Sequence, residues 1–137
     1  MKRMILGLTA AIFVTGAAIG GALAAEPAKY MDSSLGKVLV DNEKSMTLYI
    51  YTPDGTGAAK STCVDKCIAA WPPFVAAAGA MAEGDWTIVD VVDKDGQTVK
   101  MWAHKGKPLY WFVKDKAPGD VTGEGVGEVW YVVKAAM

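Results

Sequence analysis

Several residue types on which enzymes and nucleic-acid-binding proteins depend are scarce in this chain. Arg3 is its one arginine and His104 its one histidine, and after residue 24 the acidic residues outnumber the lysines by 15 to 12. Without guanidinium groups or an excess of positive charge the chain is poorly suited to grip phosphate, so we predict no nucleic-acid partner. A single imidazole excludes mechanisms that need two, and no serine lies in a Gly-x-Ser-x-Gly elbow. The sequence therefore favours a protein without catalytic activity.

Long apolar runs are also missing, except at the start of the chain. Lys2 and Arg3 precede an apolar segment at residues 4–19 and a small-x-small site that ends at Ala24. This order predicts a secretory signal peptide over residues 1–24, cleaved near Ala24. No cysteine precedes Cys63, so we expect no lipid-bearing cysteine at the cleavage point. Because the chain has no other long apolar run, we also expect no transmembrane span after cleavage. The expected location is periplasmic or secreted.

Cysteines are few as well, and both lie in the part that is exported. Cys63 and Cys67 are four residues apart, a spacing that brings two side chains to one face of a helical turn. Export places them where disulfides persist, so a structural disulfide is the interpretation that we favour. A redox-active dithiol and a pair of metal ligands are the alternatives, although redox pairs usually have two intervening residues and two cysteines do not complete a zinc site.

The remaining residues predict one small, mainly β domain. Residues 25–34 show no periodicity and are expected to form a flexible leader, followed by a single β-rich domain at 35–137 with room for one core. Runs of β-forming residues predict about six antiparallel strands, at 37–41, 46–51, 86–92, 98–103, 108–113 and 129–133. The first two of these are expected to form a hairpin.

One short helix is expected near the cysteine pair. Helix-forming residues fill the stretch from Ala58 to Ala70, and Trp71 with the two prolines after it ends the pattern. Ser61 or Thr62 is the expected cap of this helix.

The domain contains an internal repeat. The pattern Leu-Tyr-x-aromatic-x-x-Asp occurs at residues 48–54 and again at 109–115, within two related halves at about 36–75 and 95–134. Its residues are Tyr49, Tyr51 and Asp54 in the first copy and Tyr110, Phe112 and Asp115 in the second. We favour a structural interpretation, in which the aromatic rings fill the core and each aspartate caps the following turn. In the alternative, two Tyr-Asp pairs meet near a pseudo-twofold axis and hold a cation or a small polar ligand.

The chain resembles a known family over most of its exported part. The segments that carry the resemblance are Gly36–Asp41, Thr47–Tyr51, Cys63–Pro73, Gly106–Phe112 and Pro118–Gly123. They are similar to those of predicted bacterial lipoproteins with a Yx(F/W/Y)xxD motif, a family also described as a secreted repeat of unknown function. The resemblance implies export and a two-part repeat, and it implies no activity. Because the lipid-bearing cysteine is missing here, it does not extend to membrane anchoring.

Soft metal ligands are present but are not grouped by the sequence. Met101 and His104 are the candidates for copper, with Met46, Met81 and reduced cysteines as further donors. Methionines at strand positions are ordinary core residues, and a histidine in a turn is usually solvated. We therefore predict no cofactor, with a copper ion as the alternative.

Strand alternation predicts that two of the tryptophans face away from the core. Trp102 lies between core positions of its strand, and Trp111 lies between Tyr110 and Phe112, so both are expected to face away from the core. An exposed aromatic strip marks a contact with a protein or a glycan. We predict a non-catalytic binding or accessory module of the envelope, with an envelope protein or a small ligand as partner. The alternatives are a periplasmic redox or copper-handling protein and a small enzyme that uses the Tyr and Asp motifs.

Overall fold

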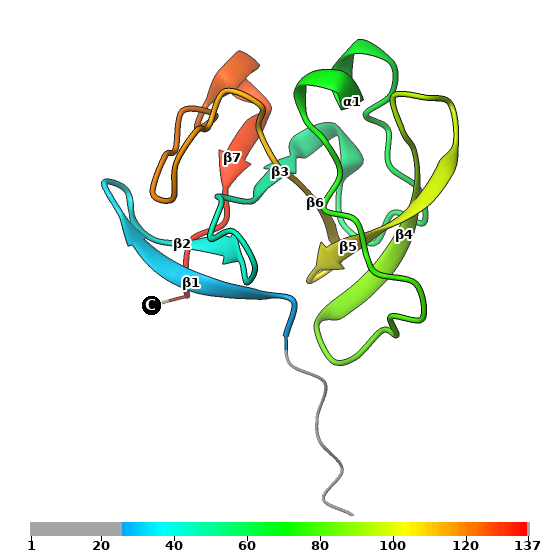
Figure 1. Cartoon of the computed structure of the whole chain (residues 1–137), viewed down its shortest axis with the longest axis horizontal. Coiled ribbons are helices and arrows are strands. Elements are labelled where there is room, and N and C mark those ends of the chain that lie inside the picture. Colours follow the sequence, from blue (N-terminus) through cyan, green and yellow to red (C-terminus); the bar gives the residue numbers. More distant parts are fainter. Residues whose placement is uncertain (1–25, 137) are drawn as a thin grey trace, which may run out of the picture.

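The computed structural model describes residues 26–136, which form two antiparallel sheets and one short helix (Figure 1). The fold is mainly β, as predicted. The first sheet has the order β1-β2 and the second has the order β4-β5-β6-β3-β7. The strands are β1 (Ala28–Ser33), β2 (Gly36–Asp41), β3 (Tyr49–Tyr51), β4 (Trp86–Val92), β5 (Thr98–His104), β6 (Lys107–Tyr110) and β7 (Trp130–Val132). The predicted signal peptide and its cleavage site lie outside the described residues.

Strand β1 corrects the expectation of an unstructured leader at residues 25–34. It pairs with β2 along its whole length, from Ala28 opposite Asp41 to Ser33 opposite Gly36. The Ser33 hydroxyl helps to close the turn between the strands, because it donates to the Gly36 carbonyl at 2.7 Å. Only Ala28 of this strand is buried, so β1 is held by backbone hydrogen bonds and carries no apolar alternation. That is why the sequence pattern did not reveal it.

The predicted hairpin of 37–41 with 46–51 forms only at its turn. Val40 bridges to Thr47, and the Asp41 side chain accepts hydrogen bonds from the backbone amides of Lys44 and Met46. Beyond Leu48 the chain leaves β2, and β3 pairs with β6 on one side and β7 on the other. The two halves of the chain therefore meet in the middle of the second sheet.

The helix is shorter than expected. Helix α1 spans Lys66–Ala70, and Trp71 ends it as predicted. Its N-cap position is Asp65, so the expectation that Ser61 or Thr62 caps it was wrong. Both hydroxyls are engaged elsewhere, in contacts with the motif residues that are described below.

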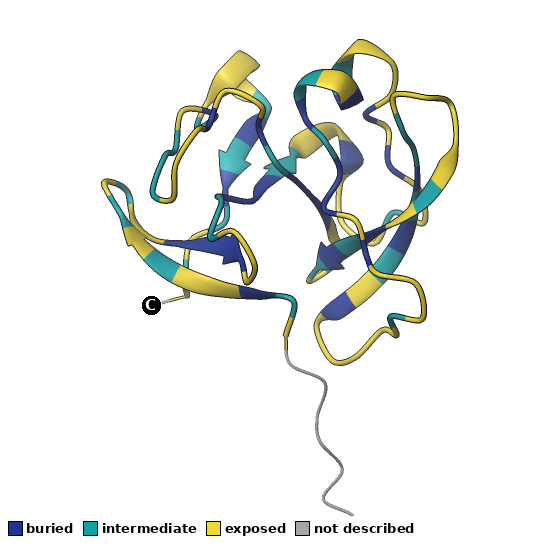
Figure 2. Ribbon diagram, viewed as in Figure 1, coloured by how far each residue is buried: buried dark blue, intermediate teal, exposed yellow. Residues whose placement is uncertain are grey.

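Buried residues lie along the central strands (Figure 2), and their side chains form two groups on opposite faces of the strands. Alternation assigns neighbouring residues to different groups: Tyr110 belongs to the larger group and Leu109 to the smaller, and Met101 and Trp102 divide in the same way. The larger group holds the motif tyrosines with Trp71, Phe112 and Trp130. The smaller group includes Leu48, Phe74 and Leu109, with Ile50, Trp102 and Trp111 packed against it.

None of the helices in the described part of the chain has the length and apolar character needed to cross a membrane.

Candidate functional site

The two copies of the motif meet at the centre of the second sheet. Tyr49 of β3 lies directly opposite Tyr110 of β6 in the antiparallel register, and both side chains are fully buried. Because equivalent residues of the two repeats face each other, the local pseudo-twofold axis passes between these strands. The sequence predicted the repeat, and the structure shows that the copies pair with each other.

Each motif tyrosine binds the aspartate of the other copy. The Tyr49 hydroxyl donates to Asp115 Oδ2 at 2.6 Å, and the Tyr110 hydroxyl donates to Asp54 Oδ2. Both carboxylates are buried, at 6% and 7% exposure for Asp115 and Asp54. The Tyr-Asp pairs are therefore exchanged between the repeats rather than formed within one motif.

The second oxygen of each carboxylate closes the loop that follows it. Asp115 Oδ1 accepts from the Thr122 amide at 3.0 Å and from the Thr122 hydroxyl at 2.5 Å. Asp54 Oδ1 accepts from the Thr62 amide at 2.8 Å and from its hydroxyl at 2.5 Å. We call this arrangement the Tyr-Asp-Thr clasp, with members Tyr49, Asp115 and Thr122 on one side and Tyr110, Asp54 and Thr62 on the other. The aspartates thus bind loop amides and, in addition, the facing tyrosines.

The two sides of the clasp differ in the group that makes the second hydrogen bond to the tyrosine hydroxyl. The Gly123 amide donates to the Tyr49 hydroxyl at 3.1 Å, whereas the Tyr110 hydroxyl is bound by Ser61 Oγ at 2.5 Å. A Cβ atom on Gly123 would lie 2.8 Å from the Tyr49 ring, so no larger residue fits there without movement. Among the described residues, no buried side-chain nitrogen or oxygen lacks a hydrogen-bond partner, and a ligand at the clasp would have to replace an existing bond.

Burial controls the chemistry of the two hydroxyls. It raises the pKa of Tyr49 and of Tyr110 far above the ordinary tyrosine value, and the hydrogen bond to a carboxylate raises each pKa further. Both groups therefore stay protonated at neutral pH and act as hydrogen-bond donors. Neither is available as a general base or as an ionised nucleophile.

The remaining motif aromatics form a continuous stack. Phe112 stacks on Trp71 with ring centroids 3.9 Å apart, Trp71 on Trp130 at 3.8 Å, and Trp130 on Tyr51 at 4.4 Å. The order Phe112-Trp71-Trp130-Tyr51 is symmetric, since the outer rings are equivalent motif positions and the inner rings end the two repeats. The two motif tyrosines meet the stack edge to face, with ring centroids 5.3 Å apart for Tyr49 and Trp71 and 5.1 Å apart for Tyr110 and Trp130, and such contacts contribute beyond the burial of apolar area. All six motif residues thus belong to one central cluster.

The predicted disulfide between Cys63 and Cys67 is present, with Cα atoms 5.2 Å apart. Cys63 is fully buried, and it follows Thr62 of the clasp directly. Cys67 lies in α1, whose end carries Trp71 into the aromatic stack. The bridge therefore joins the clasp to the stack in the first repeat. Neither cysteine of the described residues is a free thiol.

The copper candidates do not converge. Met101 is fully buried on one face of β5, whereas His104 lies on the other face, 4.5 Å from the Trp86 ring between centroids. Burial lowers the pKa of His104. Met46 is half-buried in the turn after β2, and Met81 is exposed. Within residues 26–136 no group of three or more His, Cys, Asp or Glu side chains is placed to share a metal ion.

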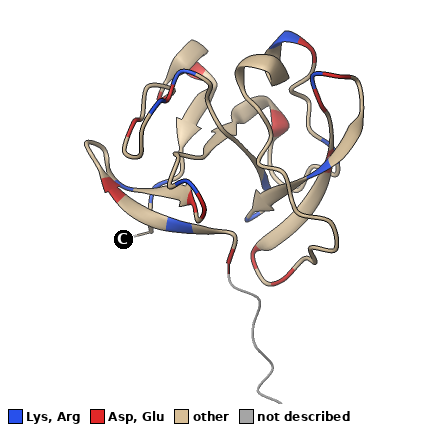
Figure 3. Cartoon of the chain, viewed as in Figure 1, with Lys and Arg blue, Asp and Glu red and all other residues tan. Residues whose placement is uncertain are grey.

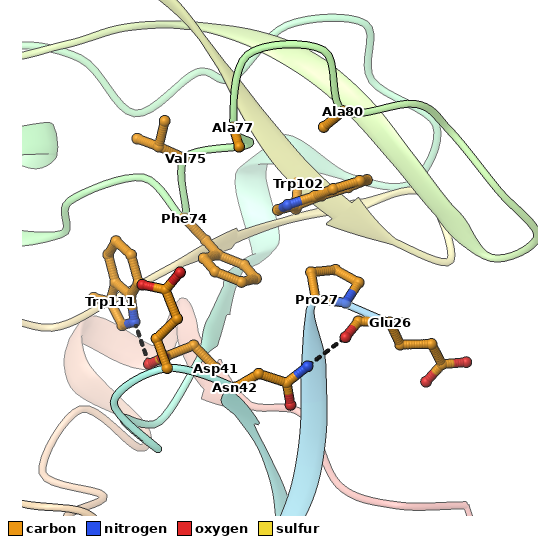
Figure 4. Close-up of a pocket in the computed structure, with 11 residues that line it drawn as sticks. Glu26, Pro27, Asp41, Asn42, Phe74, Val75, Ala77, Ala80, Trp102 and Trp111 are labelled. Atoms are coloured by element: carbon orange, nitrogen blue, oxygen red, sulfur yellow. Dashed lines mark hydrogen bonds between the residues drawn. The ribbon is translucent and has the colours of Figure 1, made fainter. Parts of the chain in front are cut away.

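A pocket of about 340 Å³ lies on the face of the central strands that is opposite the clasp (Figure 4). Trp102 and Trp111, which strand alternation turned outward, line it together with Phe74. The remaining lining comes from the residues before β1, the end of β2 with the turn after it, and the loop before β4, namely Glu26, Pro27, Asp41, Asn42, Glu43, Val75, Ala77 and Ala80. The partial exposure of both tryptophans agrees with the sequence, but nothing in the pattern indicated that these segments meet.

The walls of the pocket are held by polar contacts. Asp41 is 2% exposed, and its Oδ2 accepts a hydrogen bond from the indole N–H of Trp111 at 3.0 Å. The Trp111 and Phe74 rings meet edge to face, with centroids 5.2 Å apart. The Asn42 side chain is hydrogen-bonded to the Glu26 carbonyl, which ties the start of β1 to the pocket rim. These contacts hold Trp111, Phe74 and the segment before β1 in place around the pocket.

Comparison with known proteins gives one match. A family model described as a secreted repeat of unknown function matches residues 29–75 and residues 90–134. No curated protein and no solved structure showed significant similarity to the chain.

Proposed function

The chain belongs to this family of secreted repeats of unknown function, and on that premise we propose that it is an exported, non-catalytic binding module whose aromatic pocket holds a small ligand. The observation that carries the proposal is the pocket lined by Trp102, Trp111 and Phe74. Its volume of about 340 Å³ lies in the range of small-molecule sites, and its mainly apolar wall with a few fixed polar groups is typical of them.

The proposal divides the molecule into a frame and a site. The clasp and the stack satisfy their own polar groups and fill the core, so they support a scaffold role. The other face of the same two strands carries Ile50 and Leu109, and Trp111, which directly follows β6, packs on that face and lines the pocket. Alternation along β3 and β6 therefore lets one pair of strands carry both functions.

Divergence between the repeats favours a single site. Trp111 of the second motif corresponds to Ile50 of the first, and only Trp111 lines the pocket. A structural repeat alone does not require this difference. A tryptophan in place of isoleucine supplies a large flat surface and an indole donor for Asp41.

Export is part of the proposal. The basic start, apolar segment and small-x-small site of residues 1–24, the formed disulfide and the description of the family as secreted all support it. We propose a periplasmic or extracellular location, with the signal peptide removed near Ala24.

The test is retention of a ligand by the purified protein. The protein is incubated with the low-molecular-mass fraction of its own envelope, separated by gel filtration and analysed by native mass spectrometry. An Ala77→Trp variant places a large side chain in the pocket, and Ala78→Trp makes the same change at the next exposed loop position, which does not line it.

We expect the wild type and Ala78→Trp to retain the same molecule, and Ala77→Trp to lose it. Retention by all three proteins would place binding elsewhere. An empty wild-type protein would contradict a binding role for the pocket.

A further inference from the structure

The charged groups that line the pocket are all of one sign. Glu26, Asp41 and Glu43 contribute carboxylates, and none of the residues that line it is a lysine, an arginine or a histidine. Figure 3 shows an acidic residue just before β1 and both acidic and basic residues in the turn after β2, and of these only acidic residues line the pocket. A neutral or anionic ligand would gain nothing from this arrangement, whereas a cation would be attracted to it.

The aromatic walls point to the same charge. Faces of tryptophan and phenylalanine rings carry negative electrostatic potential and attract cations within about 6 Å of the ring centre. Phe74 and Trp111 stand at an interplanar angle of 66°, so they present surfaces in different directions. Trp111 and Trp102 lie on either side of Phe74, and all three rings line the pocket (Figure 4).

Trp111 already contacts one cation of the protein through its ring face. The Lys44 ammonium lies 5.3 Å from the centre of the Trp111 ring. Lys44 borders a neighbouring hollow and does not line the pocket, whereas Trp111 borders both. The Asp41 carboxylate bound to the indole N–H adds electron density to the ring, which strengthens its attraction for a cation.

The surroundings are unsuited to an inorganic cation. Asp41 already accepts from two backbone amides and the indole N–H, so little of its coordination capacity is free. Pro27, Val75, Ala77 and Ala80 offer only apolar surface. Calcium and magnesium require six or more oxygen ligands, whereas a cation covered by methyl groups requires apolar contact.

We propose that the pocket binds a small organic ammonium ion, methylated at nitrogen, with its charge on the ring faces and its methyl groups against the apolar wall. This inference rests on the proposed binding function and names the ligand class. The volume of about 340 Å³ is near the lower end for ligand sites, which favours a small molecule over a peptide.

Isothermal titration calorimetry with three probes tests the inference. Choline carries the methylated ammonium group, 3,3-dimethylbutan-1-ol is its neutral isostere, and methyl β-glucoside is a neutral ligand that also stacks on tryptophan. We expect choline to bind, and the neutral isostere to bind about tenfold more weakly because it lacks the cation–π and carboxylate interactions.

Two variants locate the effect. Glu43→Gln removes an exposed carboxylate at the rim, and Trp102→Leu removes one of the three aromatic rings of the pocket wall while keeping an apolar side chain. Glu128→Gln is the matched control, because this exposed acid lies in the 3-10 turn before β7 and does not line the pocket. We expect Glu43→Gln and Trp102→Leu to weaken choline binding by about three- to tenfold and Glu128→Gln to leave it unchanged.

The outcomes separate the two proposals. Equal binding of choline and its isostere, or binding of the glucoside alone, would overturn the organic-ammonium inference and leave a binding pocket in place. Failure of choline to bind, together with retention of another molecule from the envelope fraction, would do the same. An empty pocket in both experiments would overturn the binding function itself.

Discussion

The exchange of Tyr-Asp pairs between repeats makes a prediction that the sequence motif alone does not. Replacing Tyr49 with Phe removes one hydroxyl while keeping the ring. In the native protein that hydroxyl donates to Asp115 at 2.6 Å and accepts from the Gly123 amide at 3.1 Å. The variant leaves a buried carboxylate oxygen without its donor and a buried amide without its acceptor.

The magnitude follows from these two losses. A hydrogen bond to a charged group contributes about 1.5 to 3 kcal/mol, and an unsatisfied buried amide costs about 1 kcal/mol or more. We expect Tyr49→Phe to lower the free energy of unfolding by about 2 to 4 kcal/mol, which lowers Tm by roughly 8 to 16 °C in a domain of this size. Asp115→Asn keeps an acceptor for Thr122 and removes the charge, so the coupling energy between Tyr49→Phe and Asp115→Asn should be about 1 kcal/mol or more, the part of the hydrogen bond that depends on the charge.

The assay is a double-mutant cycle followed by urea unfolding with the disulfide intact. One cycle combines Tyr49→Phe with Asp115→Asn, and the control cycle combines Tyr49→Phe with Asp54→Asn. Tyr49 and Asp54 belong to the same motif but share no hydrogen bond among those of the clasp. The first cycle should show coupling, and the second should be additive within about 0.5 kcal/mol. Coupling to Asp54 instead of Asp115 would refute the exchange.

Three further predictions follow from the same region. Gly123→Ala should destabilise the protein by about 1 to 3 kcal/mol in urea unfolding, because the new methyl group would lie 2.8 Å from the Tyr49 ring; an unchanged midpoint would mean that the ring is free to move. Reduction of Cys63–Cys67 should lower stability by no more than about 3 kcal/mol while the far-ultraviolet circular dichroism stays native, because the bridge closes a short loop; complete unfolding on reduction would contradict this. Stability should fall as the pH rises above about 10, because tyrosines ionise there in the unfolded chain while burial holds the pKa of Tyr49 and Tyr110 higher in the folded one. Tm measured against pH should show a smaller alkaline loss in Tyr110→Phe than in the wild type.

The clasp explains why the motif has its spacing. The tyrosine lies within a central strand, and the aspartate follows in the short 3-10 turn Thr52–Asp54 in the first repeat. This distance lets the aspartate reach across the axis to the facing tyrosine while its other oxygen holds a threonine further along its own loop. Loss of a motif tyrosine or aspartate therefore affects both repeats, which explains why the motif occurs in two copies.

Much of the architecture was determined by the sequence itself. The mainly β fold, the helix near the cysteines, the disulfide and the outward placement of Trp102 and Trp111 all follow from patterns between residues close together in the chain. Period-two alternation, the helix stop at Trp71 and a four-residue cysteine spacing are local, so they can be recognised without knowing the fold.

Other features were decided by tertiary structure alone. Strand β1 has no apolar periodicity, because an edge strand is held by its neighbour's backbone and not by burial. Ser61 and Thr62 resemble helix caps locally, but the motif residues of the folded protein offer them better partners.

The pocket depends most strongly on tertiary structure. Folding brings five separate parts of the chain together around it, namely residue 26, the turn after β2, the segment 74–80, Trp102 and Trp111. These segments are far apart in the chain, and each by itself is an ordinary turn, loop or strand end. Their common charge and their aromatic faces acquire meaning only when the two repeats pair across β3 and β6, because that pairing determines which faces of the strands point inward to the clasp and which line the site.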